Sequence, residues 1–176
     1  MHIPKTLLST LSLYTIHTTA TPSNPPAVTT PPKSNATITN NCPFPIYLTV
    51  VSSSATSPPP EITLGRNSTY TEPYRHDAPT GGISLKLTTV AHGLYTGAPQ
   101  TIFAYTYVES TNQVWFDLSD VFGDPFRGFR VRLRPVASGG GGGAEIVWED
   151  GVPPRSGGSQ VRVVAGDVGV GLGVCV

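Results

Sequence analysis

Apolar and polar side chains alternate in several short runs along the chain. In residues 83–88, Ile83, Leu85 and Leu87 are separated by polar residues, and the same period of two recurs in residues 103–108 and 129–134. Successive side chains of a β-strand point to opposite faces, so this period predicts strands with one buried face. Further apolar runs predict strands around residues 38, 46–50, 114–118, 146–148, 161–164 and 168–176.

Prolines and glycines separate these runs. Pro58, Gly81, Gly97 and Gly151 lie in the intervening segments, where such residues are typical of turns. No stretch sustains a helical period of apolar residues. Many short strands with frequent turns predict an all-β fold, either an antiparallel β-sandwich or a barrel. A chain of 176 residues suits one such domain.

The first 20 residues differ from the rest of the chain. Lys5 precedes a short apolar stretch from Leu7 to Ile16, and small residues follow, a pattern typical of a cleaved secretory signal peptide. Residues 21–35 are rich in proline and threonine and offer few apolar side chains, which predicts a flexible linker. We therefore divide the chain into a signal peptide (1–20), a Pro/Thr-rich linker (21–35) and a folded β-domain (36–176).

Two further features indicate export. Asn35 and Asn67 each begin an Asn-x-Ser/Thr triplet, the acceptor pattern for N-glycosylation. The chain has two cysteines, Cys42 and Cys175, which can pair in an oxidising compartment if the fold brings them together. From these residues alone, two unpaired buried thiols remain the alternative.

Charge and composition exclude several classes of function. Eleven basic and eleven acidic residues balance, so no net charge favours binding to nucleic acid or to an anionic membrane. No apolar run is long enough to span a membrane. The four histidines (His2, His17, His76 and His92) are scattered, whereas a metal site needs three or four converging ligands. We expect no metal, no other cofactor and a monomeric protein.

The segment richest in candidate chemistry is 115–125, which places Asp117, Asp120 and Asp124 within eight residues. Three interpretations are open. Asp side chains stabilise turns by accepting hydrogen bonds from nearby backbone N–H groups. Carboxylates also accept hydrogen bonds from the hydroxyl groups of a bound sugar. Finally, glycoside hydrolysis uses a pair of carboxyl groups, one as acid and one as base or nucleophile.

Arginines and aromatic residues supply further candidate contacts. Arg130, Arg132 and Arg134 share one face of a predicted strand. They form a solvated face, pair with the acids across the sheet, or contact an acidic glycan. Trp115 and Tyr95 offer rings that stack on sugars, although tryptophan in a small sandwich also belongs to the core.

Several stretches resemble known proteins. Residues 36–48, Ala-Thr-Ile-Thr-Asn-Asn-Cys-Pro-Phe-Pro-Ile-Tyr-Leu, resemble the opening strand of thaumatin-like proteins. A fungal group of short secreted proteins, the yeast-phase-specific protein family (BYS domain), is more similar still. The stretches that carry this resemblance are residues 72–75, 81–86, 97–105, 114–126, 146–148 and 151–154. They follow the order of the family and extend the resemblance over residues 36–176.

The resemblance implies a thaumatin-like β-sandwich, reduced to a single domain, and export to the fungal cell wall or medium. It also implies a disulfide between the first and last cysteine, Cys42 and Cys175. Full-length thaumatin-like proteins have an acidic cleft that in some members binds or cleaves β-1,3-glucan. Asp117 matches one acid of that cleft, whereas Phe122 and Ala104 stand where two others are expected. The further cysteines that relatives carry near residues 138–143 and 163–166 are absent.

These observations predict a non-catalytic, secreted or cell-wall-associated thaumatin-like protein. It is a surface antigen or a weak binder of β-glucan or another cell-wall polysaccharide. The expected contact residues are Asp117, Asp120, Asp124, Arg130, Arg132, Trp115 and Tyr95. A β-1,3-glucan hydrolase that uses Asp117 with Asp120 or Asp124 is the first alternative. An antimicrobial or host-directed effector is the second.

Overall fold

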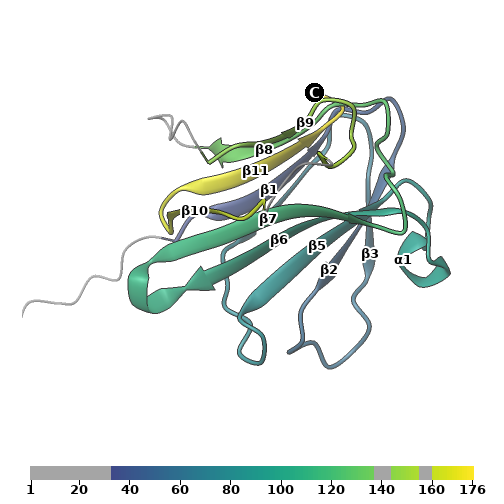
Figure 1. Cartoon of the computed structure of the whole chain (residues 1–176). Helices are drawn as coiled ribbons and strands as arrows, with labels where there is room; N and C mark the ends of the chain where they lie inside the picture. Colours follow the sequence, from purple (N-terminus) through teal and green to yellow (C-terminus); the bar gives the residue numbers. More distant parts are fainter. Residues whose placement is uncertain (1–32, 137–143, 155–159) are drawn as a thin grey trace, which may run out of the picture.

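A computed structural model of the chain describes residues 33–136, 144–154 and 160–176, which fold into two packed β-sheets (Figure 1). The five-stranded sheet has the order β4 (Thr69–Pro73), β1 (Asn35–Asn40), β11 (Gly169–Val174), β8 (Val131–Val136) and β9 (Ile146–Trp148). The six-stranded sheet has the order β10 (Arg162–Ala165), β7 (Gln113–Val121), β6 (Gln100–Val108), β5 (Gly82–Thr88), β2 (Ile46–Val51) and β3 (Glu61–Leu64). A short helix, α1 (Gly93–Thr96), and a 3₁₀ turn, η1 (Glu109–Thr111), complete the described elements. The predicted all-β sandwich is confirmed.

Neighbouring strands in the described part of the chain are antiparallel, with one exception. β1 and β11 run parallel, with Ala36 opposite Val170 and Asn40 opposite Val174. β4 flanks this pair on one side and β8 on the other. The first and last strands of the domain therefore lie side by side in the interior of the five-stranded sheet (Figure 1).

The core lies between the sheets and is built from the inward side chains of the alternating runs. Ile83, Leu85 and Leu87 of β5 are fully buried, and Phe116 and Leu118 of β7 are 2% exposed. Each such side chain contributes about 1.5–3 kcal/mol relative to an exposed position. The strands predicted at residues 83–88, 103–108 and 114–118 are confirmed.

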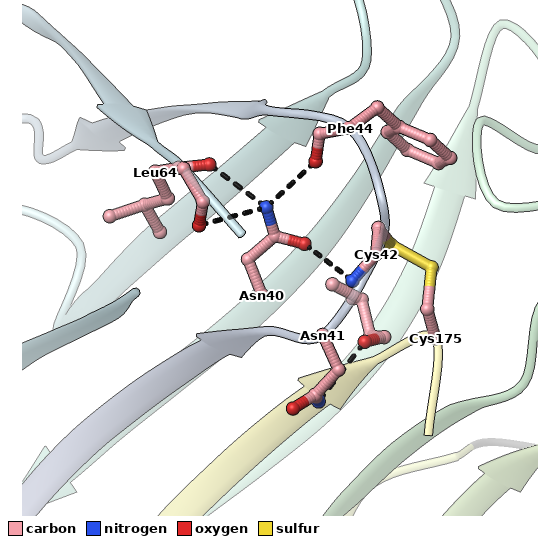
Figure 2. Close-up of a disulfide and its surroundings, with 8 residues drawn as sticks. Asn40, Asn41, Cys42, Phe44, Leu64 and Cys175 are labelled. Carbon is pink, nitrogen blue, oxygen red and sulfur yellow. Dashed lines mark hydrogen bonds between the residues drawn. A yellow bond between two sulfur atoms is a disulfide. The ribbon is translucent and has the colours of Figure 1, made fainter. Parts of the chain in front are cut away.

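A disulfide joins the loop after β1 to the residue that follows β11 (Figure 2). Asn40 orders this loop, because its side-chain amide donates hydrogen bonds to the carbonyl groups of Phe44 and Leu64, both at 2.9 Å. Its side-chain oxygen accepts a hydrogen bond from the Cys42 N–H at 2.9 Å. The Cys42–Cys175 pairing that the family resemblance implies is confirmed, and the alternative of two unpaired thiols is wrong.

Some elements depart from the sequence pattern. The pattern does not predict the edge strands β3 and β4, because β3 has only four residues and β4 carries Glu72 at an inward position opposite Ala36. The strand predicted from Phe129 begins two residues later, at Val131. The predicted signal peptide, residues 21–32 of the predicted linker and the glycine run 139–143 lie outside the described residues.

Candidate functional site

The predicted contact residues are spread over several surfaces. β7 pairs with β6 without interruption from Gln113 to Val121, so its side chains alternate between the two faces of the sheet. Trp115 and Asp117 lie on the outer face, whereas Asp120 lies on the inner face. Because the strand continues where the sequence suggested a turn, Asp117 and Asp120 point in opposite directions.

Trp115 and Asp117 line one open pocket of about 220 Å³ on the outer face of the six-stranded sheet. Trp115 is 45% exposed, although tryptophan is highly buried on average. Ala104 and Val161 contribute apolar surface beside it. Burial raises the pKa of the Asp117 carboxyl, and within the described stretches no side chain forms a hydrogen bond or an ion pair with it. The pocket, which we call the Trp115 pocket, therefore combines an exposed ring with an unused hydrogen-bond acceptor.

Asp120 and Asp124 form a different site near the end of β7. The Thr101 hydroxyl donates a hydrogen bond to Asp120 Oδ1 at 2.6 Å, while Asp120 Oδ2 is buried and receives none from the described residues. Burial raises the pKa of Asp120 to about 7, and the neighbouring Asp124 carboxyl adds to the increase. Asp124 itself pairs with Arg127. A proton on Asp120 removes the repulsion between the two carboxyl groups.

We expect the free energy of unfolding to decrease as the pH rises from about 4 to about 7.5. The pKa of the Asp120 carboxyl is about 7 in the folded protein and has an ordinary value of 3.8, so the folded state holds a proton that the unfolded state lacks. Loss of this proton leaves a partly buried charge, at a cost of about 1–2 kcal/mol once partial exposure is taken into account. Urea denaturation at the two ends of this interval measures the difference.

Asp120→Asn is the control variant, because it keeps the shape of the side chain and removes its titration. It should reduce the decrease to the part that the Asp117 carboxyl contributes, because burial raises the pKa of that group as well, and it should raise the stability at the upper end of the interval. Lys33 and Arg132 lower the pKa of the Glu109 and Glu145 carboxyl groups below 4.5. The titration of these two groups therefore changes the stability at lower pH. An unchanged slope in the Asp120→Asn protein would contradict the assignment.

The predicted arginines and Tyr95 lie away from the Trp115 pocket. Arg130 forms an ion pair with Glu149 at 2.9 Å, and Arg132 pairs with Glu145. Arg132 lies in β8 of the other sheet, and Arg130 directly precedes that strand. Tyr95 is an exposed residue of α1. The structure thus brings together two pairs, Trp115 with Asp117 and Asp120 with Asp124. Arg130 and Arg132 both lie near Glu145, away from these pairs, and Tyr95 lies apart from them in α1.

A second cavity was not found by sequence reasoning. It has a volume of about 430 Å³ and opens between β4 of one sheet and β2 and β3 of the other. Tyr70, Glu72 and Arg75 supply its polar surface from one side. We call it the β3–β4 crevice. Its one sequence signal is Glu-Pro-Tyr-Arg at residues 72–75, which carries part of the family resemblance but gives no indication of a cavity.

The described residues also bear on metal binding and membrane insertion. Within residues 33–136, 144–154 and 160–176, no group of three or more His, Cys, Asp or Glu side chains is placed to hold a metal ion. No helix in these ranges is long and apolar enough to cross a membrane. His76 lies 3.2 Å from the Tyr107 carbonyl oxygen and His92 lies 3.6 Å from a Glu61 carboxylate oxygen, so these two histidines have separate surroundings.

Comparison with known proteins agrees with the architecture. The sequence matches the Blastomyces yeast-phase-specific protein family over residues 26–176. It is 33% identical over 103 residues to an antigenic thaumatin-like protein of Arthroderma benhamiae, which covers 58% of this chain and 49% of that protein. The chain therefore spans about half the length of the curated relative it matches.

The fold is similar to that of a solved structure. The protein elicitor MoHrip2 from Magnaporthe oryzae superposes with a TM-score of 0.63 at 20% identity, over 81% of this chain and 99% of that one. The thaumatin-like xylanase inhibitor TLXI gives a TM-score of 0.45 at 10% identity, over 80% of this chain and 99% of that one.

The two sheets, their strand order and these similarities define a thaumatin-like β-sandwich. The chain belongs to the Blastomyces yeast-phase-specific protein family, since the match covers residues 26–176.

Proposed function

We propose that the protein is a secreted, non-catalytic protein of the fungal cell wall or its surroundings that binds a wall polysaccharide weakly through the Trp115 pocket. The observation that carries this proposal is the exposed Trp115 ring beside Asp117, whose carboxylate has no other partner among the described residues. The ring offers an apolar face to the C–H groups of a sugar. The carboxylate accepts hydrogen bonds from sugar hydroxyl groups.

The geometry favours binding over hydrolysis. Glycoside hydrolysis needs two carboxyl groups about 5–9.5 Å apart across the scissile bond. Asp117 is the one acidic residue among those that line the Trp115 pocket, and Asp120 faces the other side of the sheet. The hydrolase alternative, which pairs Asp117 with Asp120 or with its neighbour Asp124, therefore has no support in this arrangement. The similarity to the elicitor is confined to the fold and therefore gives no support to the alternative of an antimicrobial or host-directed effector.

Export is part of the same proposal. A disulfide is typical of oxidising compartments outside the cytosol, and the protein has one between Cys42 and Cys175. Asn35 and Asn67, the two predicted glycosylation sites, are both exposed, as an attached glycan requires. Recovery of the folded protein from culture medium, with its N-terminus determined, tests this part directly.

Trp115→Ala should reduce retention of the protein on an insoluble wall polysaccharide about tenfold, which corresponds to roughly 1.4 kcal/mol of lost contact. Co-sedimentation with insoluble β-1,3-glucan, chitin and arabinoxylan measures the bound fraction. Phe122→Ala is the matched control, because Phe122 is an aromatic residue outside the pocket that is 73% exposed. Equal retention of the two variants, or no retention of the unaltered protein on any polymer, would refute the proposal.

A further inference from the structure

The β3–β4 crevice lies where the edges of the two sheets face each other. β3 and β4 are terminal strands of their sheets, so no further strand of the described residues covers either of them on that side. Val50 and Ile62 line the crevice from the six-stranded sheet, and Tyr70 and Glu72 line it from the five-stranded sheet. Its volume of about 430 Å³ is within the range of about 300–1,000 Å³ that is usual for small-molecule sites.

Glu72 is a buried carboxylate in this crevice. It is 8% exposed and occupies an inward position of β4, opposite the fully buried Ala36. The Tyr105 hydroxyl donates a hydrogen bond to Oε1 at 2.7 Å, and the Tyr70 hydroxyl donates one to Oε2 at 2.9 Å. Arg75 Nη2 lies 3.7 Å from the same Oε2. The carboxylate is therefore positioned by tyrosines from both sheets, and it lines the cavity.

Stability alone does not explain this charge. A buried ion pair is often no more stabilising than apolar side chains of the same volume, because both ions lose their hydration. The two hydrogen bonds also leave part of the Glu72 acceptor capacity unused, since a carboxylate accepts about four. Arg75 is half-exposed, and its 3.7 Å approach to Glu72 is too long for a hydrogen bond. Donors and acceptors thus remain available side by side at the crevice.

The walls of the crevice are apolar and partly fixed. Pro59, Pro60 and Ile62 provide apolar surface opposite the Glu72–Arg75 pair. The adjoining loop is held by Asp77, which is fully buried and accepts hydrogen bonds from the Ser52 hydroxyl at 2.7 Å and the Ser54 N–H at 2.9 Å. Hydrogen bonds from these serines and from Thr80 hold the pKa of the Asp77 carboxyl well below its usual range. These hydrogen bonds hold the side of the crevice formed by Ser52 and Ser54 in place before any ligand arrives, which lowers the entropic cost of binding.

We propose that the β3–β4 crevice binds one unit of a neutral saccharide, with Glu72 and Arg75 hydrogen-bonding to its hydroxyl groups. The pair carries no net charge, so neither an anion nor a cation gains from entering. A sugar hydroxyl both donates and accepts, and therefore matches a carboxylate and a guanidinium side by side. The C–H faces of the sugar match the proline and isoleucine walls. This site is separate from the Trp115 pocket and does not depend on it.

The test uses two-dimensional ¹H–¹⁵N NMR of the folded protein with laminaritetraose, chitotetraose and mannotetraose as probes. At about 10 mM probe, even a millimolar Kd gives nearly full occupancy. We expect at least one probe to shift the amide signals of Ser52, Ser54 and Arg75 saturably. Arg75→Leu should weaken that binding at least about tenfold. Arg134→Leu, which removes an exposed arginine from β8 in the same chain, should leave it unchanged.

Two results would overturn the inference: no shift of these signals with any of the three probes, or equal Kd values for the Arg75→Leu and Arg134→Leu proteins. Glu72→Gln gives an independent check, since it keeps the size of the side chain and its amide signals report whether the protein is folded. Folded Glu72→Gln protein that binds as tightly as the unaltered chain would also count against it. In the Trp115→Ala variant, the probes should still shift the amide signals of Ser52, Ser54 and Arg75. Failure of the crevice proposal and failure of the proposed function at the Trp115 pocket are therefore distinguishable.

Discussion

Reduction of the Cys42–Cys175 disulfide should lower the free energy of unfolding by about 3–5 kcal/mol. The bond closes a loop with a sequence separation of 133 residues, which is nearly the whole domain. In the chain-entropy account, a cross-link of this length removes many conformations from the unfolded state. Domains of this size are commonly stable by about 5–15 kcal/mol in total, so the loss is a large fraction.

The folded structure should survive reduction at low temperature. β1 and β11 remain paired by five residue positions from Ala36 to Asn40, and the Asn40 side chain still connects the loop after β1 to the carbonyls of Phe44 and Leu64. We therefore expect a native circular-dichroism spectrum with a lower denaturation midpoint. A change in the spectrum itself would show that the bond is needed to form the sandwich and not only to stabilise it.

Urea denaturation with and without a phosphine reductant measures the effect while the sulfur atoms stay in place. The Cys42→Ala/Cys175→Ala double variant provides a second measurement that is independent of the redox state. Reductant should shift the midpoint of the unaltered protein and leave that of the double variant where it is. A loss below about 1 kcal/mol would mean that the unfolded chain is already restricted by other contacts.

The predictable part of the fold is the part that depends on local alternation. Ile83, Leu85 and Leu87 alternate with polar residues, and their strand and its buried face follow directly. Local alternation does not predict β4, because the polar residue Glu72 points inward, opposite the fully buried Ala36. One of the two tyrosines that donate hydrogen bonds to Glu72, Tyr105, lies 33 residues away. Which residue reaches Glu72 from that distance depends on how the two sheets pack. The local sequence pattern does not indicate it.

The candidate site shows the same limit. Asp117 and Asp120 look like members of one group in the sequence, and their separation depends on how far β7 extends. The pairing of Val121 with Gln100 shows that the strand passes Asp120, which fixes the two carboxyl groups on opposite faces. Trp115 and Asp117, two residues apart on one strand, could be placed together from the sequence. The Cys42–Cys175 pairing required either the family resemblance or the parallel alignment of β1 with β11.

Gly151→Ala should destabilise the protein by more than about 3 kcal/mol, well beyond the usual effect of adding one methyl group. Gly151 is buried with φ of +71°, a conformation that costs about 1 kcal/mol for a residue with a Cβ. The added carbon would also lie 2.6 Å from the Phe129 carbonyl oxygen and closer still to that of Phe126. These are backbone atoms, so no side-chain rotation relieves the contact.

The surrounding backbone has little freedom to move away. The Phe126 carbonyl accepts a hydrogen bond from the Phe129 N–H at 2.9 Å, and the Gly128 N–H donates one to the Asp150 carbonyl at 2.6 Å. The Phe126 side chain is itself fully buried. A shift of this turn would therefore break hydrogen bonds and open the core at the same time, and either outcome lowers stability.

Gly97→Ala separates the two contributions to the Gly151 effect. Gly97 has φ of +73° but no heavy atom within 4 Å of its Cβ position, so its substitution carries the conformational cost alone, about 1 kcal/mol. The difference between the two denaturation midpoints, at equal m-values, then measures the close approach of Gly151 to the Phe126 and Phe129 backbone. Equal midpoints would mean that the backbone of residues 126–129 shifts at little cost and that the hydrogen bond from the Gly128 N–H to the Asp150 carbonyl contributes little.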